Sequence, residues 1–265
     1  MPAEPLFILE SGRFVPSAHT RGPWDPTAQH GGAPAALVAR ALEDVAGEAF
    51  AVTRITIDLL RPVPLVPLTV AARVTKPGRR TLGAGVVIEA DGVPVVEARG
   101  VAVRLAELPT EVKAETGSLV AGPEQGRISV FGIEADLDEP AFHRTGVEVR
   151  SVGGGFDGPG PAQAWCRLQR PVVGGEEPSG LQRTAAVADF GNGLSWVLPF
   201  ERWTFVNADL SLHLSRPPEG EWIGLDATTF VSDRGTAMSE SVVYDDAGRL
   251  GRAAQSLLLE RRGPA

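Results

Sequence analysis

Residues 54–62 read RITIDLLRP, and residues 209–217 read DLSLHLSRP. In both stretches polar and apolar residues alternate, which is typical of a β-strand with one buried face, and both end at Arg-Pro. Arg61 and Arg216 lie 155 positions apart, and Gly92 and Gly248, in two later turn-like segments, lie 156 apart. Two landmarks with nearly the same offset indicate an internal duplication.

Each copy begins with a helix and continues as strands. Between Pro34 and Gly47, apolar residues recur on one helical face, and Thr184 to Val197 is the second expected helix although it contains glycines. Strands are expected at 68–74, 82–89 and 93–105 in the first copy, and at 222–231, 236–244 and 250–260 in the second. Asp91-Gly92 is a hairpin-turn signal. A helix followed by antiparallel strands predicts an α+β fold with a helix against a sheet.

Composition excludes several functional classes. The 265 residues carry 25 basic and 33 acidic side chains, a net charge of −8, which argues against nucleic acid as a partner. No run approaches the roughly 20 apolar residues of a membrane span, and the start lacks the features of a signal peptide. We therefore expect a cytoplasmic protein.

Neither a metal nor a nucleotide cofactor is expected. Cys166 is the single cysteine and lies in a strand-like stretch, so we expect a buried structural thiol. The four histidines lack metal-ligand spacing. Residues 153–158 match G-x-G-x-x-G, but Pro159-Gly160-Pro161 follows where a nucleotide-binding helix should begin, which favours a loop.

Paired glycines precede the first helix in Gln29-His30-Gly31-Gly32. The N–H groups at a helix start favour negative charge, so this end could stabilise the oxyanion formed when a carbonyl is attacked. The alternative is a structural helix start with His30 near the cap and glycines that allow close packing.

Two polar residues stand in apolar surroundings in the second copy. Asp189 lies inside the apolar run 185–194, which is costly for a carboxylate unless it is paired or functional. Its alternative is an ordinary helix N-cap. Gln255 is a lone amide in the last strand, and its alternative is a hydrogen-bonded core amide.

These features together resemble the double-hotdog acyl-CoA thioesterases, in the branch of acyl-CoA thioesterase II. The similarity rests on the order and spacing of the Gln29–Gly32 segment, the two Arg-Pro strands, Asp189 and the Gln255 strand. It implies a tandem hotdog with two antiparallel sheets, each wrapping a central helix. The implied domains are 1–106 and 148–265, joined by an interdomain linker at 107–147.

The family's catalytic set is an Asp at the second helix, a hydroxyl residue early in the following strand and a Gln in the last strand. By position these are Asp189, Asn207 and Gln255, and Asn207 departs from the threonine pattern. The resemblance implies that these three position the attacking water. It further implies that His30, Gly31, Gly32 and Gly191 bind the substrate and its oxyanion. Arg99 matches Gln255 in the first copy, so we expect a single hydrolytic site.

The implied reaction is hydrolysis of acyl-CoA to a free fatty acid and CoA, with no metal or cofactor and with a role in lipid metabolism. Because hotdog sheets expose edges and faces that often pair, we expect a homo-oligomer.

Two alternatives stay open. Asp25 and His30 have the D-x-x-x-x-H spacing of hydratase-type hotdog proteins, which add water to or remove it from an enoyl-CoA. The Asn-Pro of that motif is missing, because residues 26–29 read PTAQ. The second alternative is a non-catalytic protein that binds acyl thioesters, and Asn207 in place of a hydroxyl residue favours it.

Overall fold

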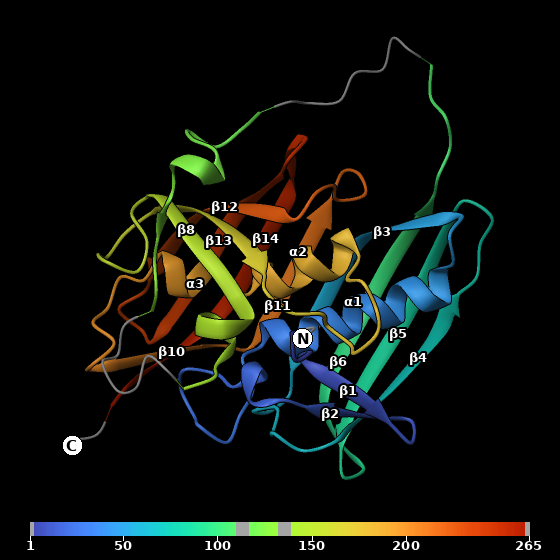
Figure 1. Ribbon diagram of the computed structural model, residues 1–265, viewed down its shortest axis with the longest axis horizontal. Coiled ribbons are helices and arrows are strands. Elements are labelled where there is room, and N and C mark those ends of the chain that lie inside the picture. The colour runs from blue at the N-terminus through green and yellow to red at the C-terminus, as the bar shows by residue number, and fades with distance from the viewer. Residues whose placement is uncertain (1–2, 110–116, 132–138, 263–265) are drawn as a thin grey trace.

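The computed structural model describes residues 3–109, 117–131 and 139–262, and has an α+β fold (Figure 1). Its helical segments are η1 (Ala18–Thr20), α1 (Gly32–Ala46), η2 (Pro123–Gln125), η3 (Phe142–Gly146), α2 (Gly180–Ala188) and α3 (Gly191–Leu194). The strands of the first half are β1 (Phe7–Glu10), β2 (Arg13–Pro16), β3 (Phe50–Leu59), β4 (Leu68–Lys76), β5 (Thr81–Ala90) and β6 (Val93–Arg104). The remaining strands are β7 (Arg127–Ile128), β8 (Val147–Gly153), β9 (Ala162–Leu168), β10 (Trp203–Asn207), β11 (Asp209–Leu214), β12 (Trp222–Val231), β13 (Thr236–Asp245) and β14 (Gly248–Arg261).

All these strands form one antiparallel sheet. Its order is β1-β2-β4-β5-β6-β3-β11-β14-β13-β12-β9-β8-β7, with β10 paired to β14 outside this path. The two repeated stretches meet in the middle, where β3 pairs with β11 from Asp58–Asp209 to Arg54–His213. The expected two sheets are therefore joined edge to edge, because the first repeat hydrogen-bonds to the second.

Helix α1 confirms the expected first helix. Gly47 ends it with a positive φ of 72° while its N–H donates to the carbonyl of Glu43. Leu37, Val38 and Leu42 are at most 1% exposed. The helix packs across β3, β4, β5 and β6 (Figure 1). On β5 buried and less buried residues alternate, which is how a strand presents one face to a covering helix.

The second helix differs from the prediction of one helix over 184–197. Helix α2 ends at Ala188, Asp189 is its C-cap, and α3 follows after Phe190. The chain leaves the regular helix here because the N–H of Asn192 donates to Oε1 of Gln255, at 3.2 Å, rather than to a carbonyl one turn earlier. The alternative of an N-cap Asp is therefore wrong, since Ser179 caps α2 by accepting from the N–H of Gln182.

Helices α1 and α2 lie against each other in opposite directions. At one end Gly32 touches α2 so closely that a Cβ there would lie 2.3 Å from the carbonyl oxygen of Ala186. At the other end Glu43 accepts hydrogen bonds from Oγ of Ser179, at 2.7 Å, and from Nε2 of Gln182, at 3.3 Å. The start of α1 is thereby fixed beside the end of α2.

Smaller expectations are also resolved. Asp91 and Gly92 both have positive φ in the turn between β5 and β6, as a tight hairpin requires. Gly154 and Gly155 form a loop after β8, also with positive φ. Cys166 is buried in β9, and burial raises the pKa of its thiol.

The domain boundaries stay a prediction. Parts of the expected linker, 110–116 and 132–138, lie outside the described residues, and the rest of it contains η2, β7 and η3. Among the helices that are described, none has both the length and the apolar character needed to cross a membrane.

The Arg-Pro pair of the second copy has a structural role. The guanidinium of Arg216 donates to both carboxylate oxygens of Asp245, which is 2% exposed at the end of β13. Burial alone would raise the pKa of Asp245, but the hydrogen bonds from Arg216 and from the N–H groups of Glu219 and Ala247 outweigh it and hold that pKa below its ordinary value. The pair therefore stabilises the folded state.

We predict that Gly32→Ala lowers the free energy of unfolding by about 1–3 kcal/mol, because the added methyl group would collide with backbone of α2. Urea unfolding followed by circular dichroism measures this. Gly122→Ala is the matched control, because a Cβ at Gly122 has no neighbour within 4 Å. Equal stability of both variants would contradict the tight helix contact.

We predict that Arg216→Ala lowers the free energy of unfolding by about 3 kcal/mol at pH 7, because it leaves the Asp245 carboxylate buried without its partner. The pKa of Asp245 is depressed in the folded state, so the pair's contribution is complete above the unfolded-state pKa, about 3.9, and is lost as the pH falls through the folded pKa. The difference from wild type should therefore narrow in acid. Arg61→Ala, its exposed counterpart, should change stability by less than about 0.5 kcal/mol. A difference independent of pH would contradict this account.

Candidate active site

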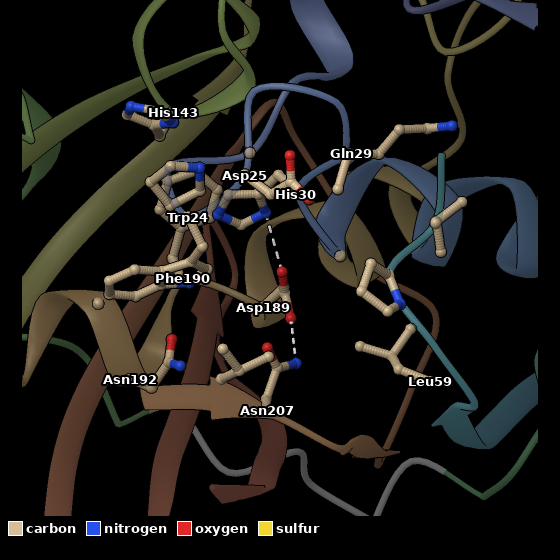
Figure 2. Close-up of a pocket in the computed structure, with 18 of the residues that line it drawn as sticks. Trp24, Asp25, Gln29, His30, Leu59, His143, Asp189, Phe190, Asn192 and Asn207 are labelled. Carbon is tan, nitrogen blue, oxygen red and sulfur yellow. Dashed lines mark hydrogen bonds and ion pairs between the residues drawn. The ribbon is translucent and has the colours of Figure 1, made fainter. Parts of the chain in front are cut away.

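The carboxylate of Asp189 is held by side chains from three separate segments. Its Oδ1 accepts from Nδ2 of Asn207, at 2.7 Å, and from Nε2 of Gln255, at 3.2 Å. Its Oδ2 lies 2.8 Å from Nδ1 of His30. Figure 2 shows Asp189 between His30 above and Asn207 below, with both contacts drawn. The structure thus brings together the three residues of the expected catalytic set and adds His30.

Regular strand geometry places the two amides. Asn207 ends β10 opposite Leu257 of β14, two residues beyond Gln255. On β14 the side chains of Ala253, Gln255 and Leu257 alternate into the interior, so the period of two carries Gln255 to the face that meets the helices. Register and alternation, rather than an irregular loop, therefore position both amides.

Gln255 supports Asp189 from behind. It is 2% exposed, and its Nε2 also lies 3.3 Å from the backbone carbonyl oxygen of Asp189. Its Oε1 accepts from the N–H of Asn192. Gln255 does not line the cavity that lies beside Asp189 and is described below. Its contacts fix the carboxylate and the start of α3.

His30 reaches Asp189 from the start of α1. Its ring stacks on Phe190, with centroids 4.8 Å apart, and packs against Phe142, at 5.0 Å. An ionised carboxylate only accepts hydrogen bonds, so the contact with Asp189 requires a proton on Nδ1. The N–H of Gly32 lies 3.1 Å from the same Nδ1, but one ring nitrogen cannot donate and accept at once. We assign the proton to the shorter, charge-assisted contact with Asp189.

A cavity of about 410 Å³ opens beside these groups. His30, Gly31, Asp189 and Asn207 line it, and most of the remaining lining is apolar or aromatic, including Trp24, Leu59, Phe131, Phe156, Phe190 and Val206. Figure 2 shows Trp24, Phe190 and Leu59 around His30, Asp189 and Asn207. A few convergent polar groups in an apolar cavity of this size are typical of a small-molecule site.

The glycines divide into two roles. Gly31 lines the cavity, and a Cβ there would lie 2.8 Å from Oδ2 of Asp189. Its N–H, at the N-terminus of α1, donates to no acceptor within the described chain. Gly32 and Gly191 do not line the cavity: Gly32 packs on α2, and a Cβ at Gly191 would lie 3.1 Å from Oε1 of Gln255. These two glycines allow close packing.

Asp25 and His30 are not joined. Asp25 is exposed, and its Oδ1 accepts from the N–H and the hydroxyl of Thr27. The hydrogen bonds from Thr27 lower the pKa of Asp25. The described contacts of the His30 ring include Asp189 and exclude Asp25. Although Asp25 and His30 have the spacing of the hydratase-type motif, their side chains therefore do not contact each other.

His143 is a cavity residue that sequence reasoning missed. It comes from η3, in the expected linker, and is only 6% exposed. Burial, with smaller effects of His30 and Arg144, lowers its pKa to about 3. Sequence position gave no signal, because nothing local predicts its burial. Among the described residues no group of three or more His, Cys, Asp or Glu could hold a metal ion.

Comparisons with known proteins agree with this architecture. The chain is similar to acyl-CoA thioesterase II TesB2 of Mycobacterium marinum, with 14% identity, a TM-score of 0.64 and coverage of 97% of this chain and 94% of that one. It is also similar to a protein of unknown function with a hot dog fold from Alicyclobacillus acidocaldarius, with 16% identity, a TM-score of 0.71 and coverage of 97% and 95%. These likenesses show a hotdog fold.

No curated protein sequence matches the chain. Family models match along most of it: residues 20–105 match the N-terminal domain of acyl-CoA thioesterase, and residues 118–259 match the C-terminal domain. The chain therefore belongs to the acyl-CoA thioesterase family.

Proposed function

We propose that the protein hydrolyses acyl-CoA to a free fatty acid and CoA, with Asp189 as the general base. The observation that carries this proposal is the Asp189 carboxylate, held by Asn207, Gln255 and His30 at the polar side of an apolar cavity. Membership of the thioesterase family supports the reaction class.

A water molecule can be placed by counting acceptor sites. A carboxylate offers about four lone-pair sites, and the described side chains occupy two on Oδ1 and one on Oδ2 of Asp189. The fourth, on Oδ2, is available to a water in the cavity. Asn207 also lines the cavity, and its own carbonyl oxygen can accept the second hydrogen of that water. Asn207 thereby replaces the hydroxyl residue that the family resemblance implies.

The reaction then follows from these positions. The water oxygen attacks the thioester carbonyl carbon while Asp189 takes one of its protons. The N–H of Gly31, at the positive end of α1, stabilises the oxyanion of the tetrahedral intermediate. The carbon–sulfur bond breaks, and the CoA thiolate leaves as the thiol by taking the proton that Asp189 had accepted, which restores the Asp189 carboxylate. The donors on Asp189 are fixed before the substrate arrives, which limits reorganisation during the reaction.

The apolar part of the cavity suits the acyl chain. We infer that each half of the chain is a hotdog domain whose central helix, α1 or α2, packs on its part of the sheet. The acyl group would lie between the start of α1, the end of α2 and the strands, where Trp24 and Phe131 line the cavity. Assembly into a homo-oligomer and a cytoplasmic role in lipid metabolism remain predictions.

We predict that Asp189→Asn lowers the rate of thiol release from acyl-CoAs of graded chain length by at least about 100-fold, because the amide cannot accept the water's proton. Asp226→Asn is the matched control, since Asp226 of β12 accepts from Nε2 of Gln163 of β9 and does not line the cavity. Equal rates in wild type and Asp189→Asn would remove Asp189 from this role. Absence of release by wild type at every chain length would contradict the proposed function, and crotonyl-CoA hydration with His30→Ala would then test the hydratase alternative.

We predict that the two amides differ in what they stabilise. Asn207→Ala should lower the rate about 10- to 100-fold with little loss of stability, because Asn207 borders the cavity. Gln255→Leu should lower the rate and also the free energy of unfolding by about 2 kcal/mol, because the N–H of Asn192 loses its buried acceptor. Parallel measurement of kcat and urea unfolding checks this. A Gln255→Leu variant with full stability and lost activity would contradict its supporting role.

A further inference from the structure

His143 is a buried side chain without a hydrogen-bond partner. It is 6% exposed, and neither Nδ1 nor Nε2 has a partner in the described part of the chain. The side chain borders the cavity that contains Asp189, and it also borders a smaller cavity of about 260 Å³ next to it. Figure 2 shows it on the same side of the site as Trp24, away from Asn207.

The surroundings of His143 do not explain this arrangement. Its ring packs edge-on against Phe131, with centroids 5.5 Å apart, and lies 6.4 Å from the ring of His30. Buried polar groups are nearly always hydrogen-bonded, because leaving one unpaired costs free energy. An apolar residue would fill the same space without that cost. The two free nitrogens border the cavity and are therefore available to a polar group of a molecule bound there.

The charge state of His143 narrows the chemistry of that group. Because burial lowers its pKa to about 3, the imidazole is neutral at physiological pH and offers one donor and one acceptor. A hydroxyl can accept from the ring N–H or donate to the other ring nitrogen, and a keto oxygen can accept from the N–H, in each case without bringing a charge into an apolar cavity. A fully aliphatic chain would leave both nitrogens unpaired.

The position of His143 limits where along the acyl chain the polar group of the substrate can be. The ring lies 6.4 Å from that of His30, which contacts Asp189 directly. If hydrolysis occurs at Asp189, a partner of His143 belongs a few carbons from the thioester carbonyl rather than at the far end of a long chain.

We propose that His143 is a specificity residue that selects acyl groups carrying a neutral oxygen substituent, a hydroxyl or keto group, near the thioester. This inference rests on the proposed function, since it assumes that the acyl group occupies the cavity beside Asp189. The hydrogen bond forms between His143 and the substituent, and the residue takes no part in bond breaking.

The test compares hexanoyl-CoA, 3-hydroxyhexanoyl-CoA and 6-hydroxyhexanoyl-CoA by thiol release. Wild type should favour the 3-hydroxy substrate in kcat/KM by about tenfold over hexanoyl-CoA, the effect of about one hydrogen bond, and should not favour the 6-hydroxy substrate. In His143→Phe, which keeps a ring but removes both nitrogens, that preference should vanish. In His143→Gln, which restores a donor and an acceptor, part of it should return.

Two results would overturn the proposal: no preference for the 3-hydroxy substrate in wild type, or a preference that His143→Phe retains. Urea unfolding of each variant shows whether it is folded. If His143→Phe is not folded, the wild-type comparison of substrates and the His143→Gln variant still decide the test.

A binding measurement distinguishes failure of the proposed hydrolysis from failure of the specificity proposal. Trp24 lines the cavity, so its fluorescence can report Kd for the same three CoA esters without turnover. If wild type releases no thiol yet binds the 3-hydroxy ester more tightly in a His143-dependent way, the proposed hydrolysis fails and the specificity proposal stands. Equal Kd values for all three esters would overturn the specificity proposal alone.

Discussion

The site depends on one contact between two helices, the approach of the start of α1 to the end of α2. Gly32 allows it, because any side chain there would meet the carbonyl oxygen of Ala186. Only with the helices this close can His30 reach Oδ2 of Asp189 and can Gly31 line the same cavity. The carboxylate comes from one half of the chain and the helix N-terminus from the other. Neither half contains the whole constellation.

The two ends of the α1–α2 pair make a similar contact with different outcomes. Where α1 ends beside the start of α2, Glu43 accepts from Ser179 and Gln182. Burial raises the pKa of Glu43, and these two donors oppose that effect. At each end, then, a carboxylate of one helix meets the N-terminus of the other, where the helix dipole favours negative charge. At one end the carboxylate of Glu43 is paired with the side chains of Ser179 and Gln182, and at the other the carboxylate of Asp189 borders a cavity.

The last strand of each half shows the same divergence. Arg99 of β6, which the repeat offset matches to Gln255, is exposed and pairs with Thr56 of β3, whereas Gln255 on β14 is buried and accepts the N–H of Asn192. The expectation that Arg99 occupies the position of Gln255 is therefore wrong, because one side chain lies at the surface and the other in the interior. The two halves share the order of their main strands, β3-β6-β5-β4 and β11-β14-β13-β12, but their polar residues make different contacts. Arg216 pairs with Asp245, whereas Arg61, its counterpart, borders the cavity.

The sequence patterns predicted those elements whose conformation depends on neighbouring residues. Alternation placed the strands, the Asp91-Gly92 turn matched its positive φ values, and α1 followed from its apolar face. The break of the second helix could not be predicted, because it depends on a hydrogen bond between residues 63 positions apart. The joining of the sheet through β3 and β11 and the burial of His143 depend in the same way on distant parts of the chain. The residues of the candidate site could be predicted because a family resemblance indicated which distant parts of the chain come together.

The distribution of hydrogen bonds within the cavity separates two tasks. Asp189 has three side-chain partners before any substrate is present, so its geometry does not have to change when charge moves. His143, bordering the same cavity, has none. Preorganisation favours a group that takes part in the chemistry, because its partners must not be rearranged during the reaction. A group that discriminates between ligands works in the opposite way. Only a donor or acceptor without a partner in the protein gains binding free energy when a ligand carries a matching substituent. Three fixed partners at Asp189, with one acceptor site open to water, and none at His143 are therefore what catalysis and selection would each require of one cavity.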